Sequence, residues 1–321
     1  MNFLQILADI EQVDPEVYDR LDSRRAIFKN MAGLGQKLSA AALPLAVGAV
    51  FNKAYAQTPA GASVADVLNF ALKLEYLESY FYNTVANVTG LSSANQAALA
   101  LIRTDEANHV AFLRTTIAAL GGTPIAVPAT AGVFDFTARG RFVSTEPNTY
   151  LALAQSFEDL GVRAYKGAAP LLMGNKTVLT AALSIHGVEA RHAARIRAMR
   201  RGLADNNTTN PAQSPPRSPY NTAPKSWISG TDGGGPVPTS IGGFSTAAIY
   251  GQGNQTNAPN GVTFPAEDNG SQGGITLSAA TFAATAGFPA SAFSEAFDEG
   301  LDVGTVAAIA NNFSATGTYF S

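Results

Sequence analysis

The chain has 321 residues and a mass of 33.3 kDa, and 46% of its residues are hydrophobic, so it is long and apolar enough to bury a core of ordinary size. It contains no cysteine, which excludes a disulfide framework, a thiolate metal site and a cysteine nucleophile. Its net charge of −3 gives no reason to expect a nucleic-acid partner.

Charge divides the chain into three predicted units. Residues 1–56 carry six basic and six acidic groups, residues 57–204 carry 13 and 10, and residues 205–321 carry two and eight. We expect the first to be an export signal or a retained N-terminal segment, the second a helical bundle, and the third an irregular extension.

The first unit resembles a twin-arginine export signal. Residues 23–29 read SRRAIFK, with Ile27 where the pattern usually has Phe. An apolar stretch, residues 38–51, and a small-x-small cleavage site, residues 54–56, follow in the expected order. The resemblance implies an exported, periplasmic or extracytoplasmic protein. Two alternatives stay open: a chance arginine pair on an amphipathic helix, and retention of the segment, with residues 31–53 against a membrane or a membrane-complex partner.

Four long helical patterns follow, and strand-like alternation is absent among them. The predicted helices run from Ser63 to about Asn87, from near Ser93 to Gly121, from Pro147 to about Ala168, and from about Lys176 to Gly202. The second connection holds about 26 residues, whereas the other two are short. Two hairpins joined by a long crossover predict a mainly α fold, a four-helix bundle of ferritin-like topology.

Two Glu-x-x-His pairs carry the chemical signal. Glu106 and His109 form one pair on the second helix, and Glu189 and His192 form the other on the fourth. An i, i+3 spacing projects both side chains from one helix face, where each pair can bind a metal. The first and third helices each offer a Glu, completing the ligand set of dinuclear carboxylate bundles. These two are Glu75 and Glu158.

The spacing of these residues repeats. Both halves read Glu-x6-Tyr-x23-Glu-x-x-His, with Tyr82 and Tyr165 two helical turns after their Glu. Such a repeat is expected when two hairpins enclose one dinuclear centre. It selects Glu75 over Glu78, which would break the spacing and stays a substitute or supporting ligand. Each Tyr is expected either to bond an opposing carboxylate or to pack in the core.

Residues 63–202 therefore resemble the ferritin-like superfamily, particularly the exported ferritin-like proteins similar to plant desiccation-related proteins. All six positions of that family's metal motif have a match here. The resemblance implies two Fe or Mn ions, bridged by Glu106 and Glu189, with Glu75 and Glu158 as terminal ligands and one His on each ion. Carboxylates with two imidazoles favour these metals over copper.

The resemblance leaves the reaction open, because ferroxidases, catalase-like enzymes, oxygen-activating enzymes and storage proteins share the motif. We expect redox chemistry on oxygen, peroxide or ferrous iron. The alternative is a non-catalytic structural or assembly subunit of a membrane-associated complex, built on the same scaffold.

Two features near the fourth helix are expected to be structural. His186 falls off the face of His192 and is read as a surface or packed residue. The basic end of the same helix is expected to be solvated or to face an acidic partner such as the chain's own extension. Its arginines are Arg191, Arg195, Arg197, Arg200 and Arg201.

The extension is rich in Asn, Gly, Pro, Ser and Thr up to about residue 274, which predicts loop wrapped on another surface. Short helices are expected at 291–299 and 303–311. The acidic residues Glu295, Asp298, Glu299 and Asp302 are expected to form a solvated face rather than a calcium site. Residues 205–321 are also the expected surface for a protein partner.

Overall fold

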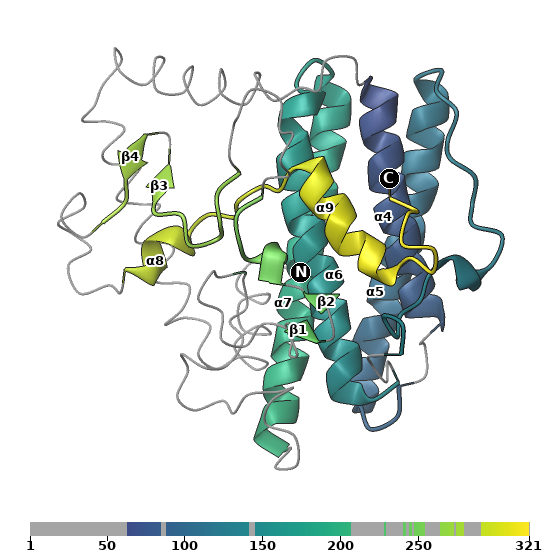
Figure 1. Ribbon diagram of the computed structural model, residues 1–321, viewed down its shortest axis with the longest axis vertical. Helices are drawn as coiled ribbons and strands as arrows, with labels where there is room; N and C mark the ends of the chain where they lie inside the picture. Colours follow the sequence, from purple (N-terminus) through teal and green to yellow (C-terminus); the bar gives the residue numbers. More distant parts are fainter. Residues whose placement is uncertain are drawn as a thin grey trace, which may run out of the picture.

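The computed structural model describes residues 63–84, 88–140, 145–206, 228, 240–241, 244–245, 247–253, 264–272, 274–278 and 290–320. The predicted export segment, its cleavage site and residues 31–53 lie outside this range. Four long helices stand side by side (Figure 1). They are α4 (Val64–Thr84), α5 (Ser93–Ala119), α6 (Pro147–Ala168) and α7 (Lys176–Asn206). The predicted mainly helical bundle is confirmed.

The helix ends follow their local sequence signals. The Asp66 carboxylate accepts hydrogen bonds from both the backbone N–H and the hydroxyl of Ser63, each at 2.8 Å, and the Ser63 Oγ accepts the Asp66 N–H, so the two residues form a capping box. Ser92 caps α5. α7 continues four residues beyond the predicted end at Gly202, because one helical glycine costs only about 1 kcal/mol.

The helices pack as two hairpins, α4 with α5 and α6 with α7. The connection between α5 and α6 is the predicted long crossover, and it contains one turn of 3-10 helix, η1 (Ala131–Val133). It also contributes to the core, because Phe136 packs edge-on against Phe81 and Phe157. The connection between α6 and α7 holds a second 3-10 turn, η2 (Ala169–Leu172).

The buried stripe of each helix follows a three-and-four spacing. On α5 the stripe is Ile102, Glu106, His109, Leu113 and Ile117. On α7 it is Ala182, Ile185, Glu189, His192, Ile196 and Met199. The Glu-x-x-His pairs therefore occupy core positions, where hydrophobic side chains would otherwise lie.

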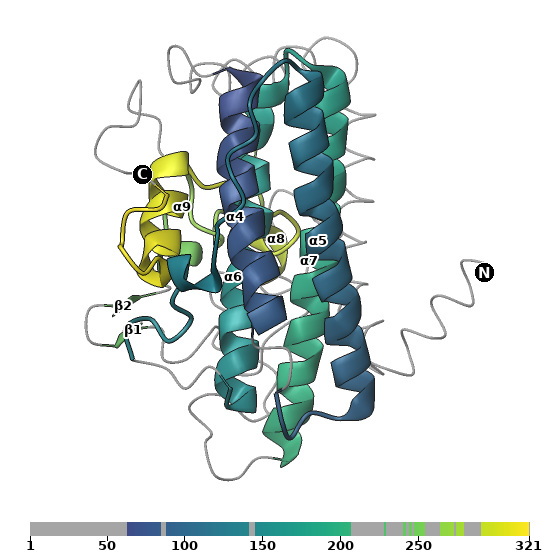
Figure 2. The ribbon, with the colours of Figure 1, turned by 90° about the vertical axis from the view of Figure 1, so that its right-hand side faces the viewer.

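α6 is buried on every side, since all residues from 149 to 163 are buried. The other three helices cover only part of its surface, and the C-terminal extension covers the rest. Helix α9 (Val303–Ala310) and the turn η4 (Ala247–Ile249) contact α6 directly. Figure 2 shows α9 beside α4 and α6, on the side of the bundle away from α5 and α7. At the described residues the extension thus wraps the bundle.

The rest of the extension is built from short elements. They are the antiparallel pair β1 (Ser240–Ile241) and β2 (Phe244–Ser245), the antiparallel pair β3 (Ser271–Gln272) and β4 (Ile275–Thr276), α8 (Ser291–Ser294) and η7 (Asn311–Phe313). A small second core forms around Leu277, Phe293 and Ala296. In the described part of the chain, no helix combines the length and hydropathy needed to cross a bilayer.

The expectation of a solvated acidic face at 295–302 was wrong. Asp302 caps α9 by accepting the Thr305 N–H at 2.8 Å. Glu299 is 9% exposed and accepts hydrogen bonds from the side chains of Asn269 and Gln272, while Glu295 is 4% exposed. Asp302 has a partner within its own helix, whereas the partners of Glu299 lie 27 and 30 residues away, where the sequence pattern did not reveal them.

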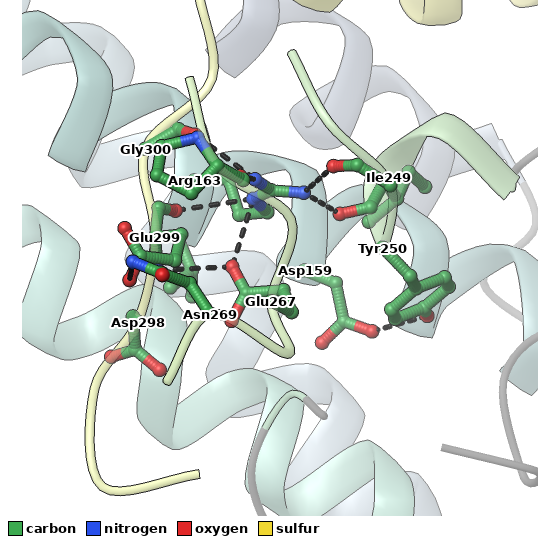
Figure 3. Close-up of polar contacts among 12 residues, drawn as sticks. Asp159, Arg163, Ile249, Tyr250, Glu267, Asn269, Asp298, Glu299 and Gly300 are labelled. Carbon is green, nitrogen blue, oxygen red and sulfur yellow. Dashed lines mark hydrogen bonds and ion pairs between the residues drawn. The ribbon is translucent and has the colours of Figure 1, made fainter. Parts of the chain in front are cut away.

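One arginine of α6 fastens the extension to the bundle. Arg163 is fully buried and pairs with the carboxylate of Glu267, its Nε lying 2.8 Å from Oε1 (Figure 3). Its guanidinium also donates to the backbone carbonyls of Ile249, Gly251, Pro265, Glu299 and Gly300. Three separate stretches of the extension therefore meet at one side chain.

The backbones of α6 and the extension touch just beyond this arginine. The Leu301 N–H donates to the Arg163 carbonyl at 3.1 Å. A Cβ at Gly167 would overlap the Leu301 carbonyl, and a Cβ at Gly300 would lie 2.8 Å from the Gly167 Cα. Glycine is required at this crossing because only a bare backbone fits.

Candidate metal centre

The structure brings all six sequence-predicted ligands together in the middle of the bundle. They form two groups of four whose ligand atoms lie within 4.8 Å of one another. The first group is Glu75, Glu106, His109 and Glu189, and the second is Glu106, Glu158, Glu189 and His192. Two carboxylates, Glu106 and Glu189, belong to both groups, as expected for residues that bridge two ions.

Each histidine turns its Nδ1 toward the carboxylates of its own group. His109 Nδ1 lies 3.2 Å from Glu75 Oε2, 3.3 Å from Glu106 Oε2 and 3.4 Å from Glu189 Oε1. His192 Nδ1 lies 2.9 Å from Glu106 Oε1 and 3.2 Å from Glu158 Oε2. Since the two ring centroids are 6.2 Å apart, the histidines occupy neighbouring but separate halves of the site.

The two tyrosines connect the two helical hairpins by hydrogen bonds. The Tyr82 hydroxyl on α4 donates to Glu158 on α6, and the Tyr165 hydroxyl on α6 donates to Glu75 on α4. Both tyrosines are buried. Of the two sequence expectations for these residues, the hydrogen bond to the opposing carboxylate is confirmed. Each phenol fixes the orientation of the carboxylate to which it donates.

Burial and mutual repulsion shift the pKa values of the site. Burial raises the pKa of Glu106 to about 7, although hydrogen bonds from both histidines oppose the shift. Burial and the neighbouring carboxylates raise the pKa of Glu189 well above its usual range. Burial lowers the pKa of His192, but the charge of Glu158 and hydrogen bonds to the carboxylates outweigh it and raise that pKa to about 12. The same balance raises the pKa of His109.

The donor set fits two divalent cations. Four carboxylates carry a charge that two such ions would balance, and the imidazoles can bind as neutral ligands. One buried carboxylate oxygen, Glu189 Oε2, accepts no hydrogen bond from the described residues, which is costly for a buried acceptor unless another group binds it. Three more face only a histidine ring: Glu75 Oε2, Glu106 Oε1 and Glu189 Oε1.

Glu78 lies beside this centre but outside both groups. It is 4% exposed, and burial, followed by the charge of Glu189, raises its pKa well above the usual range. Gly161 on α6 makes room here, since a Cβ on it would lie 2.5 Å from Glu189 Oε2 and 3.4 Å from Glu78 Oε1. The geometry thus places Glu75, and not Glu78, with the grouped carboxylates, which is the choice that the repeat predicts.

Asp105 is a partner that sequence reasoning missed. Its Oδ2 lies 3.2 Å from His192 Nε2, and its side chain is 46% exposed. With Nδ1 facing the carboxylates, this contact orients the ring and fixes its tautomer. The one sequence feature that could have indicated this contact is the position of Asp105 directly before Glu106, on the edge of α5 that faces α7.

The third histidine and the arginines of α7 also find structural partners. His186 is half-buried, with its Nδ1 2.9 Å from the Val162 carbonyl, as expected for a packed residue. The expectation of a solvated basic helix end was wrong for two arginines that are fully buried. Arg197 pairs with Asp159 at 2.6 Å, and Arg200 donates to Gln155 at 2.5 Å. Both partners lie on the side of α6 that packs against α7.

Comparison with known proteins agrees with this geometry. Residues 63–201 match the family model of the ferritin-like domain. Neither the curated proteins nor the solved structures contain a significant match to the chain.

Proposed function

We propose that the ferritin-like domain, residues 63–201, binds two Fe or Mn ions and uses them for redox chemistry on oxygen, peroxide or ferrous iron. The observation that carries the proposal is the pair of four-residue groups that share Glu106 and Glu189. A bundle that needed only a packed core would have no reason to bury four carboxylates and two histidines together, because buried charge is costly without a counterion.

The chain's own residues have separable tasks in this proposal. Glu106 and Glu189 would contact both ions, and each remaining Glu and His pair would complete one half of the centre. Tyr82 and Tyr165 hold the Glu158 and Glu75 carboxylates in place from the opposite hairpin. A pair of such ions would supply two-electron redox chemistry when bound. The buried surroundings keep bulk water from the carboxylates, which strengthens their hold on cations.

The test is the metal content per chain, measured by elemental mass spectrometry on protein purified without chelator. We expect about two Fe or Mn per chain in the wild type. Glu106→Ala and His192→Ala should lose most of this metal, whereas His186→Ala should keep it, because His186 contacts a backbone carbonyl instead. Wild-type protein without metal would contradict the proposal and favour the structural or assembly subunit.

Export by a twin-arginine route is part of the proposal and rests on the sequence of residues 23–29 and 54–56. That route transports folded protein, so the metal would be acquired before export. Replacing Arg24 and Arg25 by Lys should leave the protein in the cytoplasmic fraction of cell extracts. Unchanged fractionation would contradict the route, while the metal proposal would stand.

A further inference from the structure

A polar cavity adjoins one half of the metal centre. It measures about 200 Å³ and lies between the end of α4, the first half of α5 and the start of α6. Tyr82, which donates to Glu158, forms part of its wall, and exposed Gln96 lies at its rim. A water needs roughly 10–15 Å³ of such space, so the cavity has room for a ligand of several non-hydrogen atoms.

The other half of the centre adjoins a smaller hollow among the described residues. This hollow measures about 30 Å³ and lies beside Tyr165, with room for about two or three waters. Its lining is apolar and includes Leu301, Val303 and Val306 of the extension. The two tyrosines occupy equivalent positions in the repeat, yet the hollow beside Tyr82 is several times larger than the one beside Tyr165. Of these two hollows, the extension lines only the smaller one, so it narrows the space on the Tyr165 side.

The cavity wall indicates the class of ligand. Arg103 is its one basic residue, and no acidic residue lines it. In the part of the chain that the structure describes, neither the Arg103 guanidinium nor the Tyr150 hydroxyl makes a hydrogen bond, so both can donate to a ligand. The Tyr82 hydroxyl is already committed to Glu158. Val88, Leu91 and Leu99 complete the wall with apolar surface.

We propose that this cavity binds a small organic carboxylate, with the carboxylate on Arg103 and Tyr150 and the apolar part against the leucines. A guanidinium matches a carboxylate with two parallel N–H donors. This inference rests on the proposed function for its biological meaning, since it names the class of molecule that reaches the Glu158 half of the centre. Its test needs neither turnover nor bound metal.

The experiment is a titration of the full chain, freed of metal by chelator, with 4-fluorobenzoate followed by 19F NMR. Arg103→Gln should weaken binding at least about tenfold, the typical effect of losing a charge-assisted hydrogen bond. Ala100→Leu, which fills the cavity without altering charge, should weaken it similarly. Arg191→Gln, the same change at an exposed residue of α7, should bind like the wild type.

Three outcomes would overturn the inference: no binding to the wild type, binding that survives both cavity substitutions, or equally tight binding of neutral 4-fluorobenzyl alcohol. Circular dichroism checks that the variants are folded. Metal content is measured on the same preparations before chelation. Protein that holds no metal but binds the probe through Arg103 contradicts the proposed function alone, and protein that holds metal but fails the titration contradicts the cavity alone.

Discussion

Single residues break the symmetry that the repeat imposes. Positions 83 residues apart are equivalent, and the equivalence extends beyond the ligands, since Arg114 with Tyr76 corresponds to Arg197 with Asp159. Arg114 donates to the Tyr76 hydroxyl at 2.6 Å, and Arg197 lies 2.6 Å from Asp159. By the same count Gly161 is the equivalent of Glu78. The α4 half of the repeat thus carries a carboxyl side chain at a position where the α6 half has only a hydrogen atom.

Gly161→Ala should therefore disturb the metal centre rather than merely the helix. Its Cβ would lie 2.5 Å from Glu189 Oε2 and 3.1 Å from the Glu189 Cδ, so the Glu189 carboxylate must move. We expect metal content below half of the wild-type value. Gly187→Ala is the matched control, because nothing lies within 4 Å of its Cβ, and it should stabilise α7 by up to about 1 kcal/mol. Normal metal content in Gly161→Ala would contradict the placement of Glu189.

Metal affinity should increase with pH. Without metal, the pKa of His192 is about 12 and that of His109 is also raised, so both rings carry protons at neutral pH that an incoming ion must displace. The raised pKa values stabilise the metal-free fold fully below about pH 6.5, the ordinary value for His, and this contribution is lost as the pH rises toward 12. Metal binding therefore competes less with protons at higher pH.

Isothermal titration calorimetry of Mn²⁺ binding between pH 6 and 8, in buffers of different ionisation enthalpy, measures the protons released. About two or more per chain are expected, one from each histidine and a further share from Glu106 below its pKa of about 7. His186→Ala should show the same release, because that ring lies outside both ligand groups. An affinity independent of pH would contradict the metal-free protonation of the two histidines.

At the scale of elements, Arg163 makes the extension part of the bundle. Arg163→Met would leave Glu267 buried beside an apolar side chain, and removing one partner of a buried pair costs about 3–5 kcal/mol. The backbone carbonyls of Ile249 and Gly300 would also lose their donor. Urea denaturation should show this loss, whereas Lys166→Met, at an exposed residue near the C-terminal end of α6, should change stability by less than about 1 kcal/mol.

The double variant Arg163→Met with Glu267→Gln separates the charge from the packing. If the unpaired carboxylate is the main cost, the double variant should recover part of the stability lost in Arg163→Met. A single variant as stable as the wild type would show that the extension is not held by this side chain.

The sequence predicted the four helices and the candidate ligands because both depend on short-range spacing. The Glu-x-x-His pairs and the capping box at Ser63 are local patterns that need no knowledge of tertiary contacts. The contacts of Arg163 and Asp105 were not predicted, because they join residues far apart in the sequence. The partners of Arg163 lie 86 to 137 residues away, and the partner of Asp105 lies 87 residues away. Composition likewise predicted that the extension wraps a surface but not that the surface is α6.

The whole molecule depends on the extension more than the limits of the family match suggest. Residues 63–201 match the ferritin-like domain, yet residues 149–163 of α6 within it are all buried, and the extension covers several of their side chains from different sides. Tyr250 of the extension donates to Asp159 at 2.6 Å, Glu267 pairs with Arg163, and Phe313 packs on Phe157. A chain ending at residue 206 would uncover these side chains, leaving a buried arginine without its carboxylate and apolar surface in water.

We expect that truncated chain to aggregate or to bind a hydrophobic dye while keeping most of its helical circular dichroism, as loosely packed states do. Its metal content should also fall, because Glu158 precedes Asp159 on the exposed segment of α6 and shares its displacement. The control is Val303→Asp in the whole chain, a change at a residue that is 40% exposed, which should leave solubility unchanged. A truncated chain that is monomeric, binds no dye and holds two metal ions would show that the extension serves another purpose than completing the bundle.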